Sequence, residues 1–307
     1  MDCAICLNEL DECHKLTCGH AFHKDCISKC ARSSPHSCPT CPLCRAPMVQ
    51  IQAGIDAVKR FHVSGLLEGE IEIIQAGADL GSSLCIYTLG NIYYSGIGME
   101  SDPEKASFYW KQTEHFYASA CHNLAYLAKK NGDVTQAADY FRKAISLRPR
   151  SFYYIQLADL LGPTEEAVGL YTTALPLSDL NEKARIHLML GKIAYIRRNT
   201  TEAYGHFNRS LQINPTNNFA QVMAALSSKK TSIAHTHLDV VLSRDRNHLE
   251  AICLKGHIFV SEQNKDQAEA MLRRACSISP NAHRTEELKT VMRSFGPLTR
   301  KRCREGN

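Results

Sequence analysis

Eight cysteine and histidine residues near the start of the chain have the types and spacing of metal ligands. Two outer Cys-x2-Cys pairs enclose a Cys-x-His pair and a His-x2-Cys pair, in the order Cys3, Cys6, Cys18, His20, His23, Cys26, Cys41 and Cys44. Zinc takes four sulfur or imidazole ligands in a tetrahedron, so eight ligands are enough for two ions without an open coordination position. The spacing therefore predicts two structural zinc ions, whose binding would contribute most of the folding free energy of so short a segment.

The distribution of the 14 cysteines favours metal binding over a disulfide scaffold. Nine of them fall within residues 3–44, and the other five are scattered singly along the chain. The first residues have neither the basic region nor the apolar region of a signal peptide. Clustered cysteine and histidine without such a peptide favour a reducing compartment. We therefore expect a cytoplasmic protein, with the nucleus as the alternative location.

The order and spacing of the eight ligands resemble the RING finger, in its variant with two central histidines. The resemblance covers residues 3–45. In that family the ligand pairs interleave in a cross-brace that ties distant loops together. The resemblance implies two ligand sets, a first zinc held by Cys3, Cys6, His23 and Cys26 and a second zinc held by Cys18, His20, Cys41 and Cys44.

The last ligand pair has an alternative. Cys38 also forms a Cys-x2-Cys pair with Cys41, so Cys38 and Cys41 could be the final pair in place of Cys41 and Cys44. We prefer Cys41 and Cys44, because the segment Cys-Pro-Leu-Cys-Arg has the ending of the family.

The resemblance also implies a surface for a ubiquitin-conjugating enzyme. Ile5 matches the position of a hydrophobic contact to that enzyme, and Pro42 with Leu43 matches the opposite lip of the same groove. Arg45 matches the "linchpin" that touches both the conjugating enzyme and ubiquitin, and its planar guanidinium can donate to two carbonyl groups at once. Cys30 departs from the family, which often has Trp or another bulky apolar residue there.

The rest of the chain is predicted to be helical. In residues 48–75, Ile51, Ile55 and Val58 have helical spacing, which indicates a linker or capping helices. Residues 76–116 combine small residues, aromatic residues and a Gly-x-Gly loop, and they resemble a Sel-like repeat.

Intervals of about 34 residues that end in proline follow, and they resemble tetratricopeptide (TPR) repeats. The closing residues Pro149, Pro215 and Pro280 lie 66 and 65 residues apart, nearly twice one repeat, so we expect a degenerate repeat in each gap. The predicted units are 117–150, 151–183 (degenerate), 184–216, 217–248 (degenerate) and 249–283.

The predicted fold is a small zinc-stabilised cross-brace RING domain over residues 1–47, followed by an all-α superhelical solenoid of helical hairpins. Residues 284–307 carry clustered arginine and lysine and are expected to be a disordered basic tail. A solenoid of this kind has an extended concave face for protein partners. Its inner helices are predicted to place polar side chains there, namely His122, Asn123, Tyr126, Lys129, Arg185 and Lys192.

Composition argues against two other classes of protein. The sequence has no run of 18 apolar residues, so we expect no membrane span. The net charge is only +5, and residues 1–50 carry five basic and five acidic side chains. The zinc domain therefore offers no basic face for nucleic acid.

The resemblance implies a RING-type ubiquitin ligase with three kinds of partner: a ubiquitin-conjugating enzyme, ubiquitin, and a protein substrate on the helical repeats. The closed zinc sites could not activate water, so the ligase would act by positioning, with Arg45 as the clamp and no cysteine carrying ubiquitin. The alternative is a non-catalytic scaffold that organises a protein complex, and Cys30 is the residue that supports it.

Overall fold

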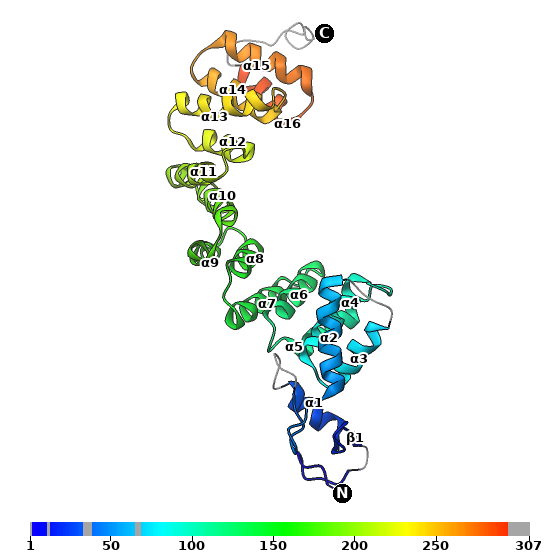
Figure 1. Cartoon of the computed structure of the whole chain (residues 1–307). Helices are drawn as coiled ribbons and strands as arrows, with labels where there is room; N and C mark the ends of the chain where they lie inside the picture. The colour runs from blue at the N-terminus through cyan, green and yellow to red at the C-terminus, as the bar shows by residue number, and fades with distance from the viewer. Residues whose placement is uncertain (1, 11–12, 33–38, 65–68, 294–307) are drawn as a thin grey trace. The chain divides into compact units, whose positions relative to one another are not determined.

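The computed structural model describes residues 2–10, 13–32, 39–64 and 69–293 (Figure 1). The chain divides into two compact units, residues 1–160 and 161–307. The first unit holds the zinc domain and the first helical hairpins, and the second holds the remaining helices. A search of the described helices for one able to cross a bilayer found none.

The zinc domain is built from short elements around a small core. Strands β1 (Cys13–Lys15) and β2 (Ala21–His23) pair antiparallel, with His14 opposite Phe22. Helix α1 (Lys24–Arg32) follows directly. Phe22 and Ile27 are fully buried and share one small cluster with Leu16 and Ala31. A core of this size is too small to fold without further support.

Helices α2 (Val49–Ser64) and α3 (Glu70–Asp79) form the first hairpin. Arg60 Nε donates to the buried Glu70 carboxylate at 2.7 Å across it. The two helices approach closely at glycine, since a Cβ on Gly77 would lie 3.3 Å from the Gly54 Cα atom. The small residues 76–78 complete α3 at this crossing.

The Sel-like segment contains the hairpin of α4 (Ser83–Ser95) and α5 (Pro103–Thr113). A Cβ on Gly90 would lie 2.5 Å from the indole of Trp110, so only glycine admits that ring. Trp110 is 1% exposed and donates from Nε1 to Asn91 Oδ1 at 3.1 Å. Asp102 caps α5 by accepting from the Lys105 N–H at 2.9 Å.

The later hairpins repeat this construction, with a small residue on one helix facing a large one on the next. In the second unit, a Cβ on Gly191 would lie 2.7 Å from the ring of Phe207. The remaining elements are α6 (Ala118–Lys130), α7 (Val134–Leu147), α8 (Ser151–Leu161), α9 (Glu165–Ala174), the 3-10 helix η1 (Leu175–Leu177), α10 (Leu180–Ile196), α11 (Thr200–Ile213), α12 (Asn218–Ser227), α13 (Thr231–Arg244), α14 (Leu249–Ser261), α15 (Lys265–Ile278) and α16 (His283–Met292). The predicted all-α repeat region is confirmed in the described residues from α2 onward.

Helix α16 corrects the expectation of a disordered tail that starts at residue 284. Leu288 and Met292 are fully buried and join the core formed by α14 and α15. Gly256 of α14 makes room for this contact, because a Cβ there would lie 2.7 Å from Leu288 Cδ2. Spaced four residues apart, the two side chains give α16 an apolar face that closes the array. The basic cluster of residues 300–304 lies outside the described residues.

Candidate metal centre and surrounding surface

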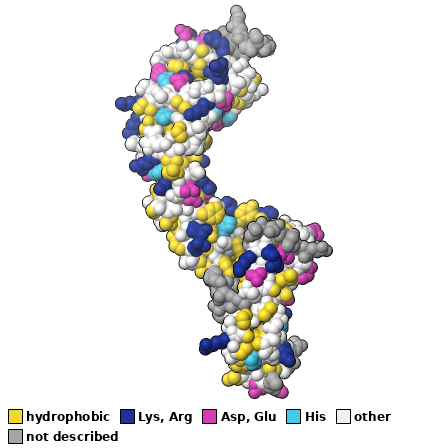
Figure 2. All heavy atoms as spheres, viewed as in Figure 1, with side chains coloured by type: hydrophobic (Ala, Val, Ile, Leu, Met, Phe, Trp, Pro, Cys, Tyr) yellow, Lys and Arg dark blue, Asp and Glu magenta, His cyan; other side chains and the backbone are white. Residues whose placement is uncertain are grey.

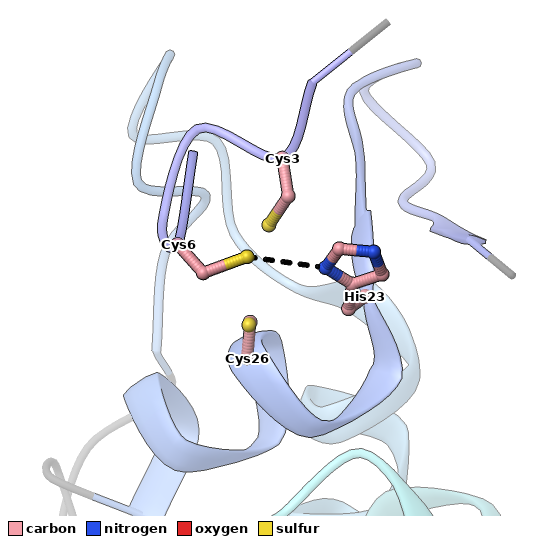
Figure 3. A group of neighbouring side chains, drawn as sticks. All are labelled: Cys3, Cys6, His23 and Cys26. Carbon is pink, nitrogen blue, oxygen red and sulfur yellow. Dashed lines mark hydrogen bonds between the residues drawn. The ribbon is translucent and has the colours of Figure 1, made fainter. Parts of the chain in front are cut away.

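The structure brings the eight predicted ligands together in two groups of four. Within each group the ligand atoms lie within 4.8 Å of one another. Figure 3 shows the sulfur atoms of the first group and the imidazole of His23 converging on one point, with Cys26 coming from the first turn of α1. The groups are Cys3, Cys6, His23 and Cys26, and Cys18, His20, Cys41 and Cys44.

The distances fit tetrahedral zinc. Zinc bonds of about 2.3 Å to sulfur and 2.0–2.1 Å to imidazole nitrogen place the two ligand atoms about 3.6 Å apart. Cys6 Sγ lies 3.3 Å from His23 Nδ1, and His20 Nδ1 lies 3.5 Å from Cys18 Sγ and 3.6 Å from Cys41 Sγ. Both groups therefore have the donor atoms and the spacing for one zinc ion each, with no position left for a reactant.

A hydrogen bond outside the first group fixes the ring of His23. Its Nε2 atom lies 3.0 Å from the Glu9 carbonyl oxygen, which can only accept. The proton of a neutral ring must then be on Nε2, and the lone pair of Nδ1 is left for the metal.

Backbone N–H groups stabilise the thiolate form of two of the cysteine ligands. Burial by itself raises the pKa of Cys3, but backbone N–H groups of His23, Cys6 and Ile5 lower it more, to about 6. Burial also raises the pKa of Cys41, and it too is lowered on balance, by the backbone N–H groups of Cys44 and Leu43. Thiolates are the form that binds zinc, so both loops favour the metal-binding state of their cysteine.

The two Cys-x2-Cys loops are zinc knuckles with the same backbone. The N–H of Leu7 donates to the Cys3 carbonyl, and the N–H of Arg45 donates to the Cys41 carbonyl, both at 2.8 Å. Leu7 and Arg45 have φ of 62° and 61°, a backbone conformation that residues other than glycine rarely adopt. Each knuckle therefore directs one specific side chain outward beside its zinc site.

The residues matched to the conjugating-enzyme groove lie at the surface of the zinc domain. Leu43 is 54% exposed, and Pro42 and Arg45 are exposed as well. Ile5 is half-buried and packs against the domain core. Cys30 is half-buried on α1. An exposed apolar side chain beside a guanidinium is a surface suited to a protein partner.

Other candidate ligands stay apart from the two metal groups. Cys13 and His14 lie in β1, and neither belongs to a group of four. Cys38, the alternative to Cys44, lies outside the described residues, as does His36. The second group is complete with Cys44.

The residues that join the zinc domain to the helices could not be predicted from the sequence. Leu80, in the turn between α3 and α4, is buried in the zinc-domain core together with Met48 and Ile51. Ser28 and Arg32 of α1 make hydrogen bonds to the helical hairpins. These residues carry no motif, and only their contacts in the folded chain identify them.

Three of the six predicted polar residues surround one cavity in the first unit. His122, Asn123 and Tyr126 line it together with Tyr94 and Trp110, and its volume is about 290 Å³. Burial lowers the pKa of His122, so its ring is neutral near pH 7. Asn123 donates from Nδ2 to Asn91 Oδ1 at 3.1 Å, which holds the amide in place.

The other three predicted polar residues do not share that cavity. Lys129 is exposed at the last turn of α6. In the second unit, Arg185 is exposed on α10, and Lys192 Nζ lies 4.6 Å from the centre of the Phe219 ring. Basic and acidic side chains are interspersed on the face shown in Figure 2, with no broad basic area.

Comparison with protein families agrees with this geometry. The family model described as "Ring finger domain" matches residues 1–45, and that described as "Tetratricopeptide repeat" matches residues 118–151 and 249–282. The N-terminal domain is a RING finger of the two-histidine type. Its two ligand groups suit two structural zinc ions, and the helices that follow are TPR-like repeats.

Relatives of the RING finger include two Arabidopsis thaliana proteins. One is "Probable E3 ubiquitin-protein ligase XERICO", 42% identical over 53 residues, which are 16% of this chain and 31% of that protein. The other is "E3 ubiquitin-protein ligase ATL9", 40% identical over 75 residues, which are 23% of this chain and 19% of that protein. The chain thus spans less than a third of either relative, and the likeness is confined to one part of it.

One solved structure resembles the helical region. It is c5321, a protective antigen present in uropathogenic Escherichia coli strains, which displays an SLR fold. The TM-score is 0.50 at 18% identity, over 84% of this chain and 58% of that one. At this identity the likeness supports the fold of the repeats, including the Sel-like hairpin, and carries no function.

Proposed function

We propose that this protein is a RING-type ubiquitin ligase. The observation that carries the proposal is the second zinc knuckle, which holds Leu43 and Arg45 exposed beside a closed metal site. A closed zinc site holds the fold and offers nothing to a substrate, so the chemistry must come from residues beside it. The names of the two plant relatives support the same activity for the RING finger.

In the proposed reaction the RING finger binds a conjugating enzyme that carries ubiquitin as a thioester. Ile5, Pro42 and Leu43 contact that enzyme, and Arg45 donates hydrogen bonds to the enzyme and to ubiquitin together. The amine of a substrate lysine attacks the thioester carbonyl, the new amide bond forms, and the thiol of the conjugating enzyme leaves. The RING finger contributes orientation, which can supply several kcal/mol of a reaction barrier.

We further propose that the helical repeats recruit the protein substrate. The cavity beside His122, Asn123 and Tyr126 supports this role, because aromatic walls with a fixed amide can bind a side chain and the peptide group next to it. Tyr126, which lines the cavity, is 52% exposed, so a partner can reach this side chain.

The test is ubiquitination of the protein itself over a panel of conjugating enzymes. We expect activity with the wild type and a loss of about tenfold or more with Arg45→Ala, at an unchanged zinc content. Leu7→Ala is the matched control, because Leu7 has the same backbone position in the first knuckle and should retain zinc equally well. Equal activity of Arg45→Ala and the wild type would refute the role of Arg45.

A non-catalytic scaffold is the second candidate, and Cys30 is the observation that favours it. A half-buried thiol offers less apolar area than the bulky residue common in the family, which weakens a groove for the conjugating enzyme. Absence of ubiquitination with every conjugating enzyme of the panel, while two zinc ions are bound per chain, would support the scaffold and contradict the ligase.

A further inference from the structure

The geometry points to a rigid seat that holds the RING finger on the helical hairpins. The seat consists of Ser28 and Arg32 of α1 against the turn at Gly81 and against Gln112 of α5. We infer that Gly81, Ser28 and Arg32 are positioning residues that decide which lysines the RING finger can serve. The role in lysine choice rests on the proposed ligase function, whereas the seat itself does not.

The seat has an apolar base. Leu80, in the α3–α4 turn, is 5% exposed and lies in the same buried cluster as Phe22 and Ile27 of the RING finger. Met48 and Ile51, at the start of α2, are 1% and 0% exposed in that cluster. The RING finger and the first helices therefore share one core, and separating them would expose apolar surface to water.

Gly81 brings the two parts into backbone contact. A Cβ on Gly81 would lie 2.4 Å from the Ser28 carbonyl oxygen and 2.8 Å from the Ser28 Cα atom. Its φ of 91° is also one that other residues rarely adopt. Any side chain at this position must push α1 away, because the atoms it meets belong to the backbone.

Two hydrogen bonds fix the rotation of α1 on this turn. Ser28 Oγ donates to the Asp79 carbonyl oxygen at 3.2 Å. One turn further along, Arg32 Nη2 donates to Gln112 Oε1 at 3.1 Å. The contacts reach two different hairpins, since Asp79 ends α3 and Gln112 lies in α5. Hydrogen bonds at two points on two hairpins oppose rotation of α1 about either one.

The seat leaves the proposed reaction surface open. Pro42, Leu43 and Arg45 stay exposed while α1 is docked. A flexible tether would let the RING finger reach lysines over a wide range of positions. A docked RING finger holds the thioester in one orientation relative to the first hairpins, which favours the lysines that meet it there.

The test compares Gly81→Ala with Gly132→Ala in the full chain. Gly132 also has a positive φ, 83°, in a turn between helices, but a Cβ there meets nothing within 4 Å. The control therefore carries the backbone strain without the clash. Arg32→Ala adds no clash and removes one hydrogen bond, so it replaces Gly81→Ala if that variant does not fold.

The first measurement is hydrogen exchange. We expect amide exchange in residues 24–32 and 48–55 to accelerate severalfold in Gly81→Ala, less in Arg32→Ala, and not in Gly132→Ala. Unchanged exchange in both seat variants would overturn the seat. This result does not depend on ligase activity.

The second measurement separates chemistry from positioning. Discharge of the ubiquitin thioester to free lysine, which any orientation can reach, should stay within about twofold of the wild type in every variant. The ubiquitinated lysines of the chain, mapped by mass spectrometry, should shift from a few preferred sites to a broader set in the seat variants only. An unchanged map, with exchange accelerated, would overturn the positioning role. Absence of discharge in all proteins would overturn the ligase function and the lysine choice with it, while exchange would still decide the seat.

Discussion

Leu7 and Arg45 have the same backbone conformation in the two Cys-x2-Cys loops and differ in their side chains. Both follow a Cys-x2-Cys pair, and both have the same positive φ and the same hydrogen bond to the first cysteine of their loop. We expect Arg45→Lys to keep two zinc ions and still lower ubiquitin transfer by about tenfold, because an ammonium group lacks the planar pair of donors. Discharge assays with zinc analysis would check this, and full activity of the lysine variant would show that charge alone is sufficient.

A histidine pair in the second unit should make stability depend on pH. His187 Nδ1 lies 3.1 Å from His206 Nδ1. Burial, then the charges of His206 and Arg209, lower the pKa of His187 to about 4. The unfolded chain therefore binds a proton more readily, so this stability is present above about pH 6.5 and lost as pH falls toward 4.

Between pH 7.5 and pH 5, the free energy of unfolding should fall by about 1 kcal/mol, a value that allows for partial exposure of the ring. Urea unfolding at pH 7.5 and at pH 5 measures it. His187→Gln should make the difference smaller, and an unchanged difference would exclude His187 as its source.

At the scale of helices, close packing at several glycines depends on a missing side chain that leaves room for a large one. Gly191 and Gly205 both lie inside helices of the second unit, but their surroundings differ. A Cβ on Gly191 would lie 2.7–3.0 Å from the buried ring of Phe207, whereas a Cβ on Gly205 would meet nothing within 4 Å. The same substitution should therefore have opposite effects at the two positions.

We expect Gly191→Ala to lower the free energy of unfolding by about 1–3 kcal/mol through overpacking. Gly205→Ala should raise it by about 0.5–1 kcal/mol, because alanine has less freedom to lose in a helix. Chemical denaturation followed by circular dichroism gives both values. Loss of stability in both variants would contradict the assignment of the tight contact to Gly191.

At the scale of the molecule, the zinc domain and the first helical hairpins belong to one compact unit and share a buried cluster. Two zinc ions should be found per chain by elemental analysis, and one ion would contradict the cross-brace.

Deletion of residues 1–47 should leave a helical circular dichroism spectrum, because α2 to α16 have their own cores. It should also lower the unfolding temperature of the first unit, because Leu80 and Ile51 lose their cover. A fully unfolded product would contradict the independence of the helical region.

Much of the site could be predicted from the sequence because zinc chemistry is local and strict. Four ligands must be cysteine or histidine at short spacings, so the order Cys3 to Cys44 limits the number of ions and the kind of domain. Repeats are similarly legible, since small and large residues recur at the same offsets in each hairpin. Helix α16 was missed because two apolar residues among charged ones give a weak pattern, and Gly256, which makes room for Leu288, is distant in sequence.

The sequence by itself determined the ligand chemistry, the RING resemblance and the helical repeats, because each is encoded by residue type at short range. Only the tertiary structure decided how the RING finger meets the helices. Asp79, Gly81 and Gln112 contact α1 across 50 to 80 residues of chain, and neither residue type nor spacing marks them. For the second zinc knuckle, both the sequence and the tertiary structure were needed. The sequence supplied Arg45, and the fold placed it at the surface beside a closed metal site.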